Sequence, residues 1–525
     1  MYPTLTLNAL EQLLEARFKE GFLSLRDLPL PYTFKDMQKA TQRIVHAIQN
    51  KEKITIIGDY DVDGVTSTTL LKLFFKEIEY PVNWIIPNRF KDGYGLSANI
   101  IPQIRGTNLA ITVDNGISAV YAAKLCKEEG IELIITDHHL IPPEIPEAYA
   151  IINQKQEGCS FPYSDICGAQ IVWYLIASLK NALNIKVNMV SYMELVSIAI
   201  IADMMPLQHI NRVMVQAGIK ALSQSTKPAI RAFLEYHQKE VLTSEDIAFF
   251  FAPLLNSAGR MEDASYAVNF LTSSNIYDAR VRLEKLVAFN SLRKTTEQVL
   301  THQVLLQADT KDDIIIAVGK EWHEGVVGIV AARIAQICQK PSIVLSENSQ
   351  GILKGSGRSF GECDLFGIVN SCREHLDKFG GHQAAIGLTL QKEKLEWFKS
   401  QIQKKYREKC YIQEISDPQI IGELSFSQIN FELITLIKKY EPYGFGNPMP
   451  KFITNDVEIL QMESMGKEGE HLRFFLKQEN IVMQAVWFKS KSFLEIGQKV
   501  QIVYTVNENH FRGKIALQLM IDKII

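Results

Sequence analysis

The 525-residue chain is too long for one hydrophobic core, so we expect two to four domains. Its 46% hydrophobic and 22% charged residues are typical of a globular protein and exclude a low-complexity chain. The formal net charge of −3 excludes nucleic-acid binding through an overall positive field, so any such binding needs a local basic groove.

The cysteines and the apolar stretches indicate the cellular compartment. Seven cysteines, an odd number without a C-x-x-C pair, argue against a disulfide framework and favour reduced thiols. Residues 1–21 carry Glu11, Glu15 and Glu20 in an amphipathic pattern, which is not that of a signal peptide. No uncharged apolar stretch is long enough to cross a membrane. We expect a cytoplasmic monomer without membrane contact.

The first half of the chain predicts helices that alternate with short strands. The expected strands cover residues 53–57, 82–86, 109–113 and 133–136, and the helices 36–50, 66–77 and 118–129. This alternation is typical of a doubly wound α/β domain with a parallel sheet. Helices then dominate from about 170 to 202 and from 211 to 236.

The second half predicts a connector and two further units. A long polar helix over 275–308 connects the lobes and leads to a second, smaller α/β domain. That domain is expected to contain strands over 314–318, 342–346 and 351–356 and a helix over 326–339. After the turn-rich segment 444–450, five short strands predict a C-terminal β-barrel of the OB type, over 452–461, 471–476, 481–488, 499–506 and 514–521.

Five regions follow from these elements. We expect an N-terminal helical extension (1–50), a catalytic domain (51–210), a helical connector (211–310), a substrate-binding α/β domain (311–410) and an OB-type nucleic-acid-binding domain (411–525).

Four acidic clusters each follow a hydrophobic run. They are the segment 58–64, Asp114-Asn115-Gly116, Asp137-His138-His139, and Asp203 after the apolar stretch 196–202. Because such runs are typical of buried parallel strands, we expect the clusters to meet at the carboxyl edge of a sheet. Six aspartates and two histidines would form a hard ligand set suited to a pair of Mn²⁺ or Mg²⁺ ions. This favours metal-assisted hydrolysis of a phosphate ester.

Simpler explanations exist for parts of this pattern. Asp59–Gly64 reads D-x-D-x-D-G like the start of an EF-hand, but a strand precedes it and Leu70 stands where an EF-hand needs Glu. Helix capping accounts for one of the three aspartates. Asp114 or Asp203 alone could simply cap a helix, so each gains weight only by fitting the same edge. Adjacent histidines directly after a strand-end aspartate are rarely ordinary surface residues.

The motifs resemble a known superfamily. Gly355–Ser359 (G-S-G-R-S) and Phe379–His382 (F-G-G-H) resemble the DHH-associated domain. Ser257–Met261 and Glu441–Phe452 resemble segments of the RecJ branch, bacterial 5′→3′ exonucleases specific for single-stranded DNA. The four acidic clusters resemble the four motifs of the DHH phosphoesterase superfamily, so the first domain resembles a DHH catalytic domain.

This resemblance implies a two-ion site bridged by Asp114. One ion is expected between Asp63, Asp114, His138 and Asp203, and the other between Asp61 and Asp114 with Asp59 nearby. Phosphatases of the superfamily carry a histidine where this chain has Ile57, which predicts a more weakly held first ion. His139 is expected to face the substrate phosphate, and Asp137 to orient the two histidines.

The resemblance also implies a substrate-binding surface. Gly380 and Gly381 could instead end a helix, and Arg358 could form a surface ion pair. Arg293 and Lys294 either line a DNA channel or form a solvated helix face. Phe511 and Arg512 are the barrel's candidates for DNA contact. The expected phosphate-binding residues are Arg260, His323, Ser356, Arg358, Ser359 and His382.

The sequence therefore indicates a RecJ-type exonuclease that releases 5′-mononucleotides from single-stranded DNA in recombination and repair. The family also implies a single-strand-binding protein and a helicase as partners. A DHH-type oligoribonuclease or nucleotide phosphatase is an alternative, although such chains usually end after the Gly-Gly-His domain. A metal-free replication scaffold is a second alternative, against which the intact ligand set argues.

Overall fold

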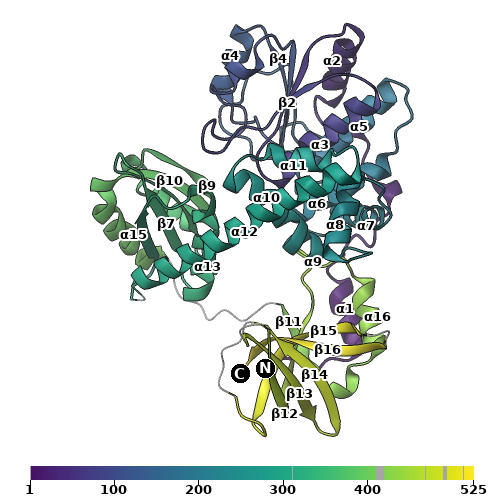
Figure 1. The fold of residues 1–525 in the computed structure, drawn as a ribbon, viewed down its shortest axis with the longest axis vertical. Helices are drawn as coiled ribbons and strands as arrows, with labels where there is room; N and C mark the ends of the chain where they lie inside the picture. The colour runs from purple at the N-terminus through teal and green to yellow at the C-terminus, as the bar shows by residue number, and fades with distance from the viewer. Residues whose placement is uncertain (1, 310, 410–418, 467–468, 489–493, 512–513) are drawn as a thin grey trace.

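The computed structural model describes residues 2–309, 311–409, 419–466, 469–488, 494–511 and 514–525 (Figure 1). Within these ranges no helix has both the length and the hydropathy needed to cross a membrane. The six cysteines in the described part of the chain are all free thiols.

The first domain is built on a five-stranded sheet in which all neighbouring strands are parallel. Its order is β2 (Asn83–Ile85), β1 (Ile54–Ile57), β3 (Leu109–Val113), β4 (Glu132–Thr136) and β5 (Ala150–Ile152). Every residue of β1 and β3 is buried, because their mostly aliphatic side chains meet helices on both faces of the sheet. The predicted doubly wound domain is confirmed, and the structure adds β5.

Helices cover both faces of this sheet. The apolar run 196–202 forms the C-terminal half of α6 (Met189–Ala202), which agrees with the helices expected from about 170 to 202, so the comparison of this run with a strand end is wrong. Periodicity failed here because α6 is buried on nearly all sides, and a uniformly apolar segment fits a buried helix as well as a buried strand. One face carries α2 (Met37–Gln49), α3 (Val62–Glu77), α5 (Gly168–Ala182) and α6 (Met189–Ala202), and the other carries η3 (Ile101–Ile104) and α4 (Val120–Glu128).

A helical connector leads to the second lobe. Its last helix, α12 (Ile276–Gln307), reaches from the first lobe to the second in Figure 1. Its bounds agree with the predicted helix over 275–308. Before it come α7 (His209–Ser223), α8 (Pro228–His237), α9 (Ser244–Asp246), the π-helical segment η4 (Ile247–Phe251), α10 (Ala252–Met261) and α11 (Ser265–Leu271).

The second domain has a mixed five-stranded sheet. The order is β6 (Ile315–Lys320), β7 (Ser342–Glu347), β8 (Ile352–Arg358), β10 (Ala385–Gln391) and β9 (Lys378–His382). Only the β6–β7 pair is parallel. Gly380 and Gly381 lie in strand β9, so the alternative that they end a helix is wrong. The helices are α13 (Glu324–Cys338), η5 (Arg373–His375), η6 (Lys392–Lys394), α14 (Leu365–Asn370) and α15 (Leu395–Lys409).

The C-terminal domain is a closed five-stranded barrel, as predicted. Strands β12 (Lys451–Met465), β13 (His471–Gln478), β14 (Ile481–Trp487), β16 (Lys514–Ile524) and β15 (Lys499–Phe511) follow one another around it, and β15 pairs back with β12. Outside the closed ring lie β11 (Ile420–Glu423), which pairs with β12, η7 (Phe426–Gln428) and α16 (Phe431–Lys439).

The N-terminal residues pack into this barrel domain rather than onto the first lobe. Leu5, Leu10, Leu14 and Phe18 belong to the barrel core, around α1 (Leu7–Glu15). Both chain ends lie in this domain (Figure 1). Beyond α1, η1 (Leu25–Asp27) and η2 (Pro31–Thr33) lead back to the first lobe.

Arg212 forms contacts between the first lobe and the barrel domain. Its guanidinium lies 4.3 Å from the Phe22 ring centroid and donates hydrogen bonds to the carbonyl oxygens of Lys439 and Glu441. A cation over an aromatic ring and two charge-assisted hydrogen bonds hold this junction in one geometry. The barrel domain is therefore attached to the first lobe by direct contacts of Arg212.

Candidate metal centre and active site

The loop after β1 places three aspartates at the sheet edge. Asp61 caps α3, where its carboxylate accepts a hydrogen bond of 3.1 Å from the backbone N–H of Gly64. This is the single capping role that the sequence allowed. A Cβ at Gly64 would lie 2.5 Å from the Asp59 carbonyl oxygen, so only glycine lets the loop close this tightly. Asp59 and Asp63 therefore do not cap this helix.

The N-terminus of α5 fixes Asp63 in place. The backbone N–H groups of Gly168 and Ala169 donate to its carboxylate at 2.5 and 2.8 Å. The positive end of a helix dipole favours such an anion. A Cβ at Gly168 would stand 2.7 Å from the Asp114 side chain, so glycine also allows α5 to approach the second motif. Sequence patterns did not indicate this role of α5.

Asp114 follows β3 in a left-handed backbone conformation with φ of 63°. Asn115 stabilises this turn, since its side-chain amide donates to the carbonyl oxygens of Ile57 and Val113 and its Oδ1 accepts from the Leu96 N–H. Aspartate tolerates this conformation better than most residues do. The result is a carboxylate held directly above the edge between β1 and β3.

The two histidines lie in different environments. His138 Nε2 lies 3.2 Å from Asp114 Oδ1, 3.6 Å from Asp203 Oδ2 and 3.8 Å from Asp63 Oδ2. His139 Nδ1 lies 2.7 Å from Asp137 Oδ1, and Asp137 also accepts a hydrogen bond from the Ile117 N–H. Asp137 therefore orients His139, whereas His138 points into a ring of carboxylates.

Asp203 reaches the same place from a helix. It is the C-cap residue of α6, and its side chain is 28% exposed, more than the other carboxylates facing His138. One ligand atom from each residue lies within 4.8 Å of the others in three groups: Asp59, Asp61 and Asp114; Asp63, His138 and Asp203; and Asp114, His138 and His139. The first two groups bring together the residues that the sequence predicted for each ion, except that Asp114 is grouped only with Asp59 and Asp61 of these; their role as ligands stays a prediction.

The electrostatics of these residues favour a bound cation. Burial, reinforced by neighbouring carboxylates, raises the pKa of Asp59 and Asp114 well above its usual range, that of Asp63 to about 6 and that of Asp203 to about 8. Burial lowers the pKa of His138 to about 3, which leaves its imidazole neutral and able to coordinate.

Several oxygens of this cluster also lack a protein partner. Asp59 Oδ1, Asp114 Oδ1 and Asp203 Oδ2 are buried without a hydrogen bond. Buried charges of one sign are costly unless paired or bound to a metal. An oxygen-rich set with one or two imidazoles fits Mn²⁺ or Mg²⁺, so these residues fit the predicted pair of ions.

Adding Mn²⁺ to chelator-treated protein is expected to raise its melting temperature. The cation pairs these carboxylates only in the folded state, and a concentration of 100 times the dissociation constant stabilises by about 2.7 kcal/mol. For a folding unit of this size that is a shift of roughly 5–10 °C. Scanning calorimetry with and without chelator measures the shift. Asp203→Asn should reduce it and Glu144→Gln, on the exposed surface of the same domain, should not; equal shifts in both variants would place the cation elsewhere.

An arginine cluster faces the carboxylates. It consists of Arg89, Arg260, Arg293 and Arg358; burial and the charge of Arg89 lower the pKa of Arg260 to about 10, with smaller effects from Arg293 and Arg358. Arg260 Nη1 donates to the Gly325 carbonyl oxygen of the second domain. Because neighbouring cations repel one another, such a cluster favours an anion with several oxygens.

Sequence reasoning missed Arg89. Its guanidinium carbon lies 4.0 Å from the ring centroid of Tyr60, which sits in the acidic loop itself. Tyr94 was also missed, and its hydroxyl lies 3.5 Å from His139 Nε2. Both residues belong to the glycine-punctuated loop after β2. The position of this loop was the available signal, because the loop follows a strand of the same parallel sheet.

The remaining phosphate-binding candidates lie in the second domain. Ser356 is close to Arg358 on β8: a Cβ at Gly328 would lie 3.3 Å from Ser356 Oγ and 3.2 Å from Arg358 Nη2. His323 caps α13, with Nδ1 accepting from the Gly325 N–H. Ser359 donates its hydroxyl to the Cys363 carbonyl oxygen, and His382 is exposed at the end of β9. Their phosphate contacts stay a prediction.

The DNA-binding candidates outside the two α/β domains differ in their burial. Arg293 is largely buried and pairs with Glu297 at 2.9 Å, so it is not part of a solvated helix face. Lys294 is exposed. Arg512 and the side chain of Phe511 lie outside the described residues.

Known proteins share the domain architecture of this chain. Residues 53–200 match the DHH family, N-terminal domain, residues 311–408 the DHHA1 domain, and residues 420–523 the RecJ OB domain. The single-stranded-DNA-specific exonuclease RecJ of Escherichia coli is 32% identical over 532 residues, which cover 93% of this chain and 90% of that protein. RecJ of Bacillus subtilis is 31% identical over 524 residues, which cover 95% of this chain and 65% of that protein's length.

A solved structure agrees with these relatives. RecJ from Thermus thermophilus in complex with Mn²⁺ has a TM-score of 0.80 and 25% identity, covering 94% of this chain and 72% of that chain. An identity of 32% across nearly the full lengths of two proteins, with three domain matches in the same order, shows that this chain belongs to the RecJ family of the DHH superfamily.

Proposed function

We propose that this chain is an exonuclease that hydrolyses single-stranded DNA from the 5′ end and releases 5′-mononucleotides. One observation carries the proposal: a partly buried group of carboxylates and imidazoles lies near a cluster of arginines contributed by two lobes. Such a pairing suits a phosphodiester, because the carboxylates and imidazoles take cations and the arginines take phosphate oxygens. RecJ relatives are named for activity on single-stranded DNA.

We propose a division of labour between the two sides of the site. Asp63, Asp114, His138 and Asp203 would hold one ion, and Asp59, Asp61 and Asp114 the other. Two such ions activate a water and neutralise the leaving oxygen of an in-line displacement. Relatives of known structure contain Mn²⁺ or Mg²⁺.

The protein's own groups would orient the substrate. His139, oriented by Asp137, would face the phosphate and donate from its imidazole. Burial lowers its pKa, but the hydrogen bond to Asp137 and the charges of Asp137, Asp61 and Asp203 together outweigh burial and raise the pKa of His139 to about 9. Arg260 and Arg358 would bind the terminal phosphate oxygens as planar forks. Ser356 lies beside Arg358 and would add a hydroxyl donor.

A labelled oligonucleotide tests the proposal. With Mn²⁺ present, a single strand labelled at its 5′ end is expected to release labelled mononucleotide at once, whereas the matching duplex stays intact. A strand labelled at its 3′ end should release label only after complete digestion. Preference for an RNA dimer or a nucleotide phosphate would support the small-substrate alternative. Binding of the single strand that is independent of metal, without any hydrolysis, would support a metal-free replication scaffold.

The family relationship supports further proposals about the cellular setting. We propose a cytoplasmic monomer that acts in recombination and repair, supplied with single strands by a helicase and guided by a single-strand-binding protein. The five domain bounds predicted above are part of the same proposal.

A further inference from the structure

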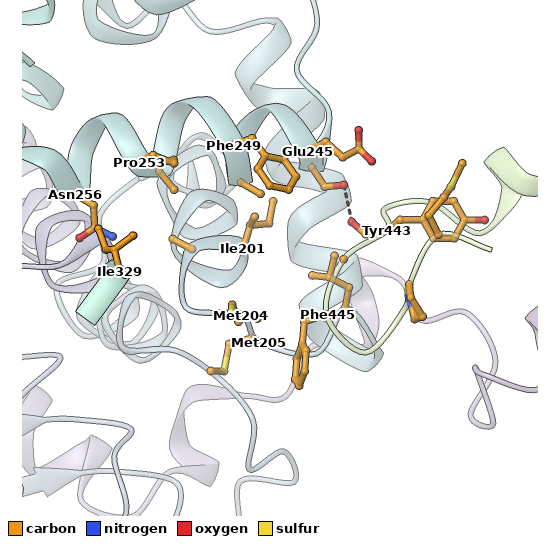
Figure 2. Close-up of a pocket in the computed structure, with 18 of the residues that line it drawn as sticks. Ile201, Met204, Met205, Glu245, Phe249, Pro253, Asn256, Ile329, Tyr443 and Phe445 are labelled. Atoms are coloured by element: carbon orange, nitrogen blue, oxygen red, sulfur yellow. Dashed lines mark hydrogen bonds between the residues drawn. The ribbon is translucent and has the colours of Figure 1, made fainter. Parts of the chain in front are cut away.

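A cavity opens beside the candidate metal centre. Its volume is about 600 Å³, and its lining includes Ala202, Met204 and Met205, which flank Asp203 in the sequence. Figure 2 labels the two methionines. Arg260 and Arg293 of the arginine cluster also line it. The cavity is therefore continuous with the proposed phosphate site. It has a size typical of a site for a small organic group.

Two phenylalanines line this cavity from different elements. Figure 2 shows Phe249 on the helix above and Phe445 on the loop below, where the ring of Phe445 extends away from Phe249. Phe249 is 72% exposed and Phe445 is 56% exposed. Large aromatic rings left open to solvent inside a cavity are available for a ligand.

The π-helical segment η4 is responsible for the exposure of Phe249. Three phenylalanines follow one another here, and only Phe251 is buried, stacked on Phe233 with ring centroids 4.0 Å apart. This stack anchors the segment. Single π-helical turns inside α-helices occur frequently at functional sites. The irregular turn thus presents an aromatic ring to the cavity on a firmly anchored backbone.

The loop that carries Phe445 is also fixed. The Leu207 N–H donates to the Phe445 carbonyl oxygen at 2.7 Å, and Ser244 Oγ donates to the Tyr443 carbonyl oxygen at 2.7 Å. Gly446 has φ of 74°, and a Cβ there would lie 2.8 Å from Pro206. The loop that carries Phe445 is therefore bound through its backbone to residues 206 and 207, a few positions after Asp203.

We infer that Phe249 and Phe445 stack on bases of the single strand adjacent to the nucleotide being cleaved. The inference rests on the proposed function and adds two residues that determine its specificity. The arginines at one side of the cavity suit the phosphates of that strand, and the apolar walls suit its bases. A base in a duplex is paired and stacked on its neighbours, so only an unpaired strand offers free base faces to separated rings.

Binding of a fluorescent oligothymidylate in the presence of chelator tests the inference without catalysis. Phe249→Ala and Phe445→Ala are each expected to weaken binding about 10-fold, because stacking on one aromatic ring contributes on the order of this factor. Phe250→Ala is the matched control: this neighbouring ring is 46% exposed but does not line the cavity. It should bind like the wild type. Equal affinities in all variants would overturn the inference.

Abasic substitutions separate stacking from any structural effect of the variants. In the wild type, removing one base near the 5′ end should weaken binding about 10-fold at one or two positions. In the double variant Phe249→Ala/Phe445→Ala the same removal should have little further effect. An abasic strand that binds the wild type as well as the complete strand does would overturn the inference. A wild type that binds no single strand at all would instead contradict the proposed function.

Discussion

Asp114→Asn is expected to lower the turnover of single-stranded DNA by about 10³-fold or more. Asp114 is grouped with Asp59 and Asp61 and also lies 3.2 Å from His138 of the other group, so in the proposed arrangement one substitution weakens both ion sites at once. Metal ions contribute several kcal/mol to such reactions, and each 1.36 kcal/mol is a factor of ten in rate. Asparagine is the substitution of choice because it keeps the shape and tolerates the left-handed φ of 63°. Single-turnover kinetics with Mn²⁺ measures the loss.

Asp114→Asn should also stabilise the metal-free protein, whereas most mutations that abolish activity at buried residues destabilise. Burial and the neighbouring carboxylates, Asp63 first, raise the pKa of Asp114, so this carboxylate opposes folding when no cation is present. Without metal, the variant is expected to melt at a higher temperature than the wild type, and Mn²⁺ should then stabilise it less. Binding of single-stranded DNA in chelator should stay within about 3-fold of the wild type. Full turnover with an unchanged Mn²⁺ shift would refute the bridging role.

The acidic motifs could be predicted because their geometry is local. Asp59, Asp61 and Asp63 follow β1 directly, and Asp114 follows β3, so the parallel sheet alone brings them to one edge. The histidines follow β4 by the same rule. Asp203 was correctly assigned to this edge for a wrong local reason. It ends a buried helix, and the packing of α6 on the sheet, not strand order, carries it there.

Other features depend on contacts between distant segments and left no local pattern. Gly168 matters because Asp114 lies 2.7 Å from the position of its missing Cβ, which depends on how α5 docks. Arg89 joins the arginine cluster only after the loop beyond β2 folds over Tyr60. The packing of residues 5–18 into the barrel, hundreds of residues away, was equally hidden. An amphipathic N-terminal helix shows that it needs a partner but not which one.

Gly325→Ala is expected to lower turnover by about 10²-fold while both α/β domains stay folded. A Cβ at this position would lie 2.0 Å from the Arg260 carbonyl oxygen, a backbone atom of the first lobe, so one lobe must move. The substitution does not harm α13 itself, because alanine favours a helix by about 1 kcal/mol over glycine. A misplacement of about 1 Å costs roughly 10²-fold in rate when it separates catalytic groups. The carboxylates belong to the first lobe, whereas Ser356 and Arg358 belong to the second.

The metal centre should be unaffected by this change, which distinguishes displacement from unfolding. The Mn²⁺-dependent shift in melting temperature should equal that of the wild type, whereas KM should rise because Arg358 moves away from the phosphate. Gly387→Ala is the matched control: it lies on β10 of the same domain, and a Cβ there would meet nothing within 4 Å. Its turnover should be normal. If Gly325→Ala were equally active, closure of the two lobes at Arg260 would not be needed for cleavage, and the arginines would act from a looser arrangement.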